Sequence, residues 1–172
     1  FVDEAYLELM DDPQAESMID LVRDGLDVIV ARTFSKVHGM AGLRIGYGIA
    51  KPDVIAELRK FQMTIPNTVG LRGAIASYQD TEFQAFSRAK IVEGRQLVYD
   101  VCAELGLEAV TSDGNFVMFD TGVPADAVMR RFSAEGVLLR PMADYPGYAR
   151  VSIGTVENMS AFQAALRRIA AA

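Results

Sequence analysis

The chain has 172 residues, of which 51% are hydrophobic and 23% charged, and its formal net charge is −6, an ordinary composition for a soluble globular protein with a sizeable core. The acidic balance argues against nucleic acid as a partner, and the lack of an apolar run of about 18 residues argues against a membrane span. One cysteine and one histidine leave no internal disulfide and no plausible zinc cluster, so no metal is expected.

The first residues are interpreted as the end of a strand, because Phe1 and Val2 are apolar and a polar run follows them. Asp3 then lies at the carboxyl end of that strand, where an isolated aspartate is typical of a turn or a helix cap. Glu4 is interpreted as a solvated side chain. Since the first residue is not Met, we expect the chain to be one part of a longer polypeptide.

The next elements predict a crossover between parallel strands. Asp12-Pro13 marks a turn, and residues 17–22 predict a short helix that ends at Gly25. Residues 27–32 are rich in β-branched side chains and predict a strand that is buried on both faces. In open α/β sheets, ligands bind at the carboxyl ends of such strands.

The stretch 33–48, which follows this strand, sets Lys36 in apolar sequence among hydroxyls and glycines. An apolar setting disfavours a charged amine, so Lys36 can act as a nucleophile toward a carbonyl or as a general base. Thr33 and Ser35 supply hydroxyl donors, and Arg44 can clamp phosphate oxygens with two parallel hydrogen bonds. The sequence therefore predicts a site for a phosphorylated carbonyl compound here.

The rest of the chain is predicted to continue the sheet, to pass through helices and to end in an α+β lobe. Residues 43–50 predict a second buried strand, and residues 69–78 predict a small-residue helix that suits either a dimer contact or a buried crossing. The other expected helices are 52–61, 81–105, 124–135 and 158–170, and the other expected strands are 107–110, 115–120, 137–141 and 149–154.

Motifs in this order along the chain resemble the pyridoxal-phosphate-dependent aminotransferases of fold type I, classes I and II, and most closely the histidinol-phosphate aminotransferase branch. They are the segment 3–6, the hydroxyl-x-hydroxyl-Lys run that ends at Lys36, Arg44 eight residues later, and the segment 150–155. The resemblance implies an α/β fold, with part of the mainly parallel large-domain sheet and a smaller α+β C-terminal domain. It identifies the chain as the C-terminal half of such an enzyme, divided into residues 1–80 of the cofactor-binding domain, an interdomain helix 81–105 and a small domain 106–172.

The same resemblance implies pyridoxal 5'-phosphate as the cofactor. Lys36 would carry it as a Schiff base and move a proton, and Asp3 would keep its pyridine nitrogen protonated, so these residues are expected to be catalytic. Tyr6 matches the tyrosine that hydrogen-bonds the phenolic oxygen of the cofactor. The phosphate would be held by Thr33, Ser35 and Arg44.

Two arginines are expected to bind the substrate. Arg140 and Arg150 each lie in an apolar strand, where a buried arginine is costly unless it is paired, so a structural ion pair is the simplest interpretation of either. The resemblance implies that Arg150 grips the α-carboxylate of the amino acid and that Arg140 helps to bind a distal anion. The segment 141–146 resembles that of no single substrate class. His38 is interpreted as packing the loop.

The expected function is transfer of an amino group between an amino acid, or a phosphorylated amine like histidinol phosphate, and a 2-oxo acid. Two alternatives stay open: another fold-type-I enzyme, such as a decarboxylase or lyase, and a non-catalytic binding module. A homodimer in the cytoplasm is expected, with export left open because the N-terminus of the parent protein is not visible.

Overall fold

The computed structural model describes residues 1–171, with all of their side chains except those of residues 125 and 126. The chain divides into two compact units, Phe1–Arg88 and the part from Ala89 onward. The long helix α5 (Thr81–Glu104) runs through this boundary. The division into 1–80, 81–105 and 106–172 stays a prediction.

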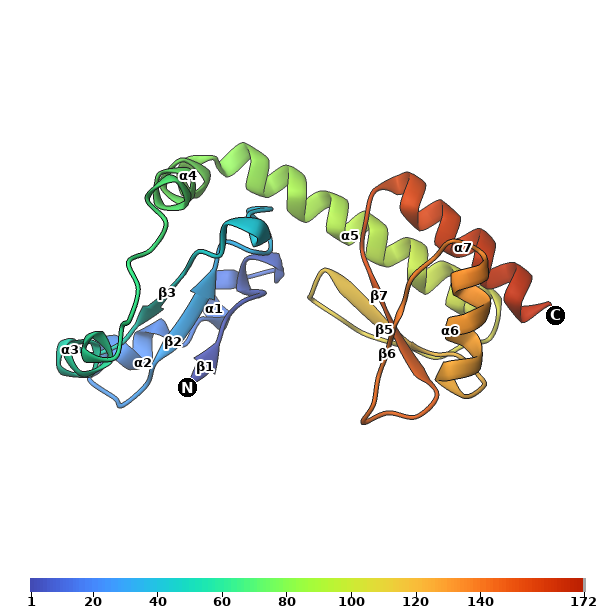
Figure 1. Cartoon of the computed structure of the whole chain (residues 1–172), viewed down its shortest axis with the longest axis horizontal. Coiled ribbons are helices and arrows are strands. Elements are labelled where there is room, and N and C mark those ends of the chain that lie inside the picture. The colour runs from blue at the N-terminus through green and yellow to red at the C-terminus, as the bar shows by residue number, and fades with distance from the viewer. Residues whose placement is uncertain (172) are drawn as a thin grey trace. The chain divides into compact units, whose positions relative to one another are not determined.

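The first unit is built around the three-stranded sheet β1 (Val2–Asp3), β2 (Val30–Thr33) and β3 (Gly46–Ile49), in the order β1-β2-β3 (Figure 1). β1 and β2 are parallel, as the predicted crossover requires, whereas β2 and β3 are antiparallel. The other elements are η1 (Leu7–Leu9), α1 (Pro13–Glu16), α2 (Ile19–Arg23), η2 (Ala41–Leu43), α3 (Pro52–Lys60) and α4 (Thr68–Gln79).

The prediction that residues 43–50 form a buried strand is wrong in extent and in burial. Arg44 has a left-handed backbone, with φ of 55°, which interrupts the extended conformation, so β3 begins only at Gly46. Gly46, Tyr47 and Gly48 are exposed because β3 is an edge of the sheet in this unit and two of these residues have no side chain to bury.

The register of the sheet places small and polar residues on one of its faces. Asp3 pairs with Ala31, and across the sheet Ala31 pairs with Gly48 and Thr33 with Gly46. Because side chains alternate along a strand, these residues share a face, whereas Arg32, its partner Tyr47 and the residue after β1, Glu4, point to the other. The backbone N–H of Glu4 continues the ladder by donating to the Ala31 carbonyl at 2.9 Å.

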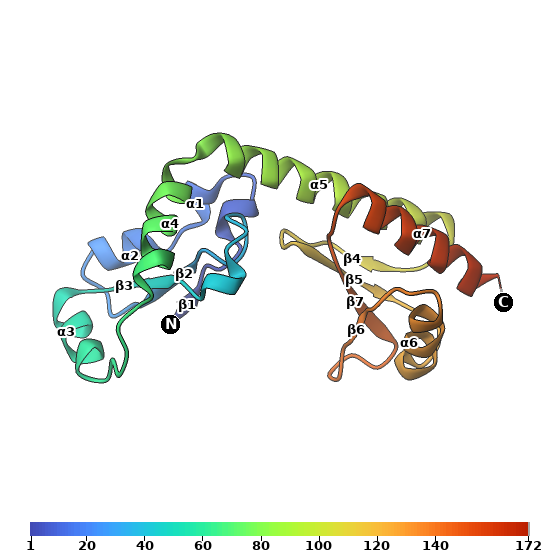
Figure 2. The ribbon, with the colours of Figure 1, turned by 45° about the horizontal axis from the view of Figure 1, so that its top comes forward.

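The second unit contains the rest of α5 and the elements β4 (Ala109–Val110), β5 (Phe116–Asp120), α6 (Ala125–Ala134), β6 (Arg140–Pro141), β7 (Tyr148–Ser152) and α7 (Val156–Ala170). Its four-stranded sheet has the order β4-β5-β7-β6 and antiparallel pairs throughout. The predicted succession of strand, strand, helix, strand, strand and helix is therefore confirmed. α7 runs alongside α5, where Gln163 Nε2 donates to the Leu97 carbonyl at 2.8 Å (Figure 2).

Aromatic side chains dominate the core of this unit. The Phe132 and Phe162 rings are stacked with centroids 5.8 Å apart, and the Phe119 ring meets that of Phe162 edge-on at 5.7 Å. Cys102 is buried in the same core, and burial raises the pKa of its thiol to about 11, so it is a small apolar side chain rather than a nucleophile. No helix in residues 1–171 is long and apolar enough to cross a membrane.

Candidate functional site

Lys36 lies half-buried in the loop that follows β2. Its Nζ is 4.5 Å from the centroid of the Tyr6 ring, which is a cation–π contact. Tyr6 belongs to the segment that follows β1, the parallel neighbour of β2. Two predicted site residues that are distant in the sequence therefore meet at the carboxyl ends of neighbouring strands.

The residues after Lys36 hold its loop in place. Val37 and His38 are buried, at 1% and 6% exposure, and His38 Nδ1 lies 3.0 Å from the Ser77 hydroxyl on α4. The His38 ring also packs 4.6 Å from that of Phe34. Burial lowers the pKa of His38, and the hydrogen bond to Ser77 opposes this only in part, so the imidazole stays neutral near pH 7. These contacts fit the interpretation of His38 as a loop-packing residue.

The hydroxyls of Thr33 and Ser35 form a small cluster beside the lysine. Thr33 Oγ1 lies 2.9 Å from Ser35 Oγ, and the Ser35 backbone N–H donates to Thr33 Oγ1 at 3.1 Å. Both residues are half-buried. Because each hydroxyl has the other as a near neighbour, both can rotate and donate to an oxyanion that comes between them.

Arg44 is the one non-glycine residue with positive φ in the described part of the chain, with φ of 55° and ψ of 49°. A side chain in this conformation costs on the order of 1–3 kcal/mol, and such strain clusters at ligand sites. Its Nη1 donates to the Ala41 carbonyl at 2.8 Å, and it forms no ion pair with a described residue. The exposed guanidinium therefore keeps further donors for an anion.

Asp3 ends β1 with an exposed carboxylate. Its Oδ1 accepts a hydrogen bond from the Ala5 backbone N–H at 3.0 Å, so the turn-forming role predicted for an isolated aspartate is realised. One acceptor bond leaves the carboxylate with further acceptor positions. The same side chain can therefore form the turn and accept from a ligand N–H.

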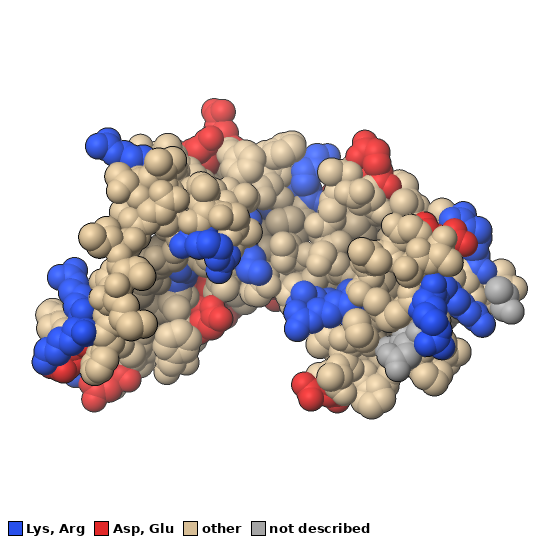
Figure 3. Space-filling view, in the orientation of Figure 1, with Lys and Arg blue, Asp and Glu red and all other residues tan. Residues whose placement is uncertain are grey.

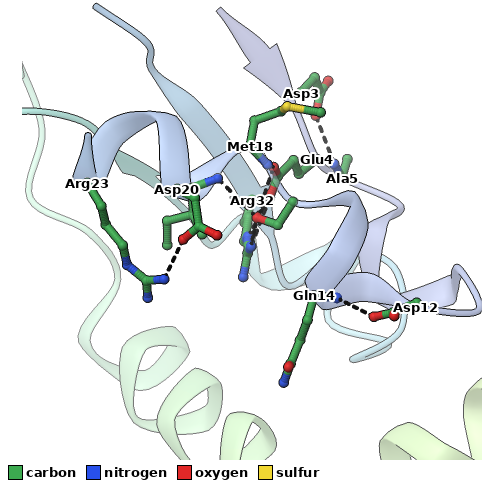
Figure 4. A network of polar contacts seen from close by, with 11 residues as sticks. Asp3, Glu4, Ala5, Asp12, Gln14, Met18, Asp20, Arg23 and Arg32 are labelled. Carbon is green, nitrogen blue, oxygen red and sulfur yellow. Dashed lines mark hydrogen bonds and ion pairs between the residues drawn. The ribbon is translucent and has the colours of Figure 1, made fainter. Parts of the chain in front are cut away.

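The interpretation of Glu4 as solvated is wrong. Glu4 is buried, at 6% exposure, and its carboxylate pairs with Arg32 Nη2 at 2.9 Å (Figure 4). The available signal was Arg32, a charge at the end of an apolar strand that needs a buried partner.

Arg140 and Arg150 lie directly opposite each other on the antiparallel strands β6 and β7. The Arg150 guanidinium carbon is 4.8 Å from the Phe116 ring centroid, and its buried Nε has no hydrogen-bond partner. Neither arginine forms an ion pair with a described residue, so the structural ion pair finds no support in this part of the chain. Like charges in opposed positions are unfavourable, and a buried donor is costly, unless an anion binds to both.

The two units define a mixed α/β protein with a lysine loop at the carboxyl end of a sheet strand. The profile of the family described as aminotransferase class I and II matches residues 1–166. The chain belongs to this family.

Relatives and solved structures agree with this assignment. The histidinol-phosphate aminotransferase of Symbiobacterium thermophilum is 39% identical over 169 residues, which cover 96% of this chain and 46% of that protein. The histidinol-phosphate aminotransferase 2 of Methylococcus capsulatus is 37% identical, over 98% of this chain and 46% of that protein. The crystal structure of histidinol-phosphate aminotransferase from Sinorhizobium meliloti in complex with pyridoxal-5'-phosphate matches with a TM-score of 0.88 and 32% identity, over 98% of this chain and 48% of that one.

These matches confirm the predicted family resemblance and the fold-type-I class. The chain spans about half the length of the curated relatives that it matches. In the described residues, no group of three or more His, Cys, Asp or Glu side chains is arranged to hold a metal ion.

Proposed function

We propose that the chain is part of a pyridoxal-phosphate-dependent aminotransferase. The reaction is transfer of an amino group between an amino acid, or a phosphorylated amine like histidinol phosphate, and a 2-oxo acid. The observation that carries the proposal is the position of Lys36, whose amine lies 4.5 Å from the Tyr6 ring at the carboxyl ends of β1 and β2. Supporting it are the family assignment and the relatives named for the same reaction.

The residues present fit pyridoxal 5'-phosphate. The face of the sheet that bears Asp3, Ala31, Thr33 and two glycines has no bulky side chain, which leaves room for a flat ring. Lys36 supplies an amine for the cofactor's aldehyde, and the donors for its phosphate are Thr33, Ser35 and Arg44. When bound, the cofactor supplies an electron sink for the charge that develops at the α-carbon of the substrate.

The side chains of this unit then have separate tasks. The amine of Lys36 removes a proton from the α-carbon of the substrate and returns one to the adjoining carbon, as base and then as acid. Asp3 stabilises the protonated pyridine nitrogen, and the Tyr6 hydroxyl donates to the phenolic oxygen. Thr33, Ser35 and Arg44 hold the phosphate, so that the reacting atoms keep one alignment with respect to Lys36.

The anionic groups of the substrate are assigned to Arg150 and Arg140. Supporting this are their opposed positions on β6 and β7 and the Arg150 Nε that has no partner. A bound carboxylate would satisfy that donor and offset the repulsion between the two guanidinium groups. Binding by Arg150 would give the grip on the α-carboxylate, and Arg140, which is exposed, would hold a second anion.

The test of the function is an amino-transfer assay with histidinol phosphate and a 2-oxo acid on Arg150→Lys, after the chain has been joined to the portion of the Symbiobacterium relative that the match leaves uncovered. Lysine keeps the charge but loses the two-pronged geometry. A lost contact of about 2–3 kcal/mol should lower kcat/KM about 30- to 150-fold, with unchanged affinity for pyridoxal phosphate.

Arg168→Lys is the matched control, because Arg168 forms an exposed ion pair with Glu135 and should tolerate the change. Unchanged kinetics in Arg150→Lys would remove Arg150 from the substrate site. Release of carbon dioxide without amino transfer by the unsubstituted protein would instead favour a decarboxylase.

The proposal includes a homodimer in the cytoplasm. For the dimer, the support is apolar surface on the first unit, where Phe61, Met63 and Ile65 are exposed by 78%, 96% and 92%. Figure 3 shows largely uncharged surface in the region of α4 between scattered charged side chains. For the compartment, the support is a single cysteine, which suits a reducing environment.

A further inference from the structure

We propose that the buried ion pair of Glu4 and Arg32 positions the cofactor site, by holding the segment that bears Asp3 and Tyr6 in register with the strand that leads to Lys36. The inference rests on the proposed function. Neither residue is assigned to the cofactor or the substrate, so both act through their neighbours. Glu4 and Arg32 are therefore positioning residues.

The carboxylate of Glu4 is saturated with hydrogen bonds. Its Oε2 accepts from Arg32 Nε and Nη2, both at 2.9 Å, and its Oε1 accepts from the Met18 backbone N–H at 2.6 Å. The Ser17 hydroxyl lies 3.2 Å and 3.1 Å from the two oxygens and accepts from Arg32 Nη2 at 2.8 Å. Figure 4 shows Glu4 turned toward Arg32 and Met18, with Asp3 outside this cluster.

This network connects every strand of the first unit. Glu4 follows β1, Arg32 lies on β2, and its cross-strand neighbour Tyr47 lies on β3. Burial lowers the pKa of the Arg32 guanidinium, but hydrogen bonds with Glu4 and Tyr47 outweigh it and raise the pKa overall. The side chains of Glu4 and Arg32 are only 4% and 17% exposed, so the pair is shielded from water.

The network lies directly behind the proposed cofactor face. Asp3 precedes Glu4 and Thr33 follows Arg32, and alternation puts each neighbour on the opposite face of the sheet. Any slip of Glu4 along Arg32 would therefore shift Asp3 relative to Thr33 and Lys36. Displacements of about 1 Å are enough to impair binding and chemistry at such a site.

The backbone alone provides little resistance to such a slip. β1 has only two residues, and its register with β2 is fixed by the pairs of Val2 with Val30 and Asp3 with Ala31. A parallel pair this short is a weak constraint. The geometry therefore assigns the fixing of the register to the Glu4–Arg32 pair.

The test measures capture of pyridoxal 5'-phosphate by the full chain, with borohydride to fix the cofactor onto Lys36. Glu4→Gln keeps the size of the side chain but removes its charge, and the double variant Glu4→Gln/Arg32→Gln removes both buried charges. Both should bind the cofactor about tenfold more weakly, or worse, and label Lys36 correspondingly more slowly. The double variant should recover most of the melting temperature that the single variant loses, without recovering capture. Asp20→Asn is the control, because Asp20 forms an exposed pair with Arg23 nearby and should capture normally.

The outcomes separate this proposal from the proposed function. Normal affinity and normal labelling of Lys36 in the folded double variant would overturn the positioning role and leave the function standing, since the pair would then be only structural. If Glu4→Gln does not fold, the double variant decides alone. If the unsubstituted chain itself does not label Lys36, the proposed function fails and the positioning role fails with it.

Discussion

Lys36→Ala should abolish amino transfer while the fold remains intact. The loop is held by Val37 and His38, and the recorded contact of Lys36 is with the Tyr6 ring, worth about 0.5–1 kcal/mol, so little stability should be lost. Loss of the proton-transfer group alone should cost about 100- to 10,000-fold in kcat, and loss of the covalent link to the cofactor should cost more. The measurement is turnover of histidinol phosphate by the joined protein described above, together with its melting temperature.

Lys51→Ala is the control for this substitution. The Lys51 amine pairs with the Asp27 carboxylate and lies in a different part of the unit, so turnover should be unchanged. Wild-type turnover in Lys36→Ala would end the aminotransferase proposal. A large fall in melting temperature would show instead that Lys36 contributes mainly to the fold.

Asp3→Ala should weaken cofactor binding and remove most of the rate. A carboxylate on the pyridine nitrogen makes a charge-assisted hydrogen bond worth about 1.5–3 kcal/mol, so the rate should fall about 10- to 150-fold. The loss should be in kcat, because an unprotonated ring is a poorer electron sink. Turnover and the affinity for pyridoxal phosphate are measured on the same joined protein.

Asp12→Ala is a closely matched control for Asp3→Ala. Asp12 caps α1 by accepting from the Gln14 and Ala15 backbone N–H groups, as Asp3 accepts from that of Ala5 (Figure 4). Both substitutions remove a local cap, but only Asp3 ends a strand of the sheet beside the lysine loop. Equal effects of the two substitutions would reduce Asp3 to a turn residue.

The features that the sequence predicted well depend on local signals. Apolar runs and helix-ending glycines predicted the alternation of strands and helices in the second unit, and Gly106 and Gly136 have the positive φ typical of helix ends. The crossover between β1 and β2 followed in the same way from a short helix between two strands. The motif around Lys36 was also local, and it carried the family resemblance that the comparisons confirm.

The features that were missed depend on pairing between distant residues. Glu4 is buried because Arg32 reaches it across the β1–β2 pair, and no local pattern at Glu4 indicates this. Arg140 and Arg150 are opposed because of the register of β6 with β7, which side-chain periodicity alone does not determine. The left-handed backbone of Arg44 likewise has no signal in its residue type, since arginine seldom adopts that conformation.

The most direct test of the account is to map where borohydride fixes pyridoxal 5'-phosphate on the chain. Trypsin normally cuts after Lys36, so a cofactor on that lysine should yield an uncut peptide from Thr33 to Arg44 that carries the added mass. The account predicts that label at low cofactor concentration is confined to this peptide and disappears in Lys36→Ala. Label spread over the other lysines, Lys51, Lys60 and Lys90, with an unmodified cut after Lys36, would contradict it.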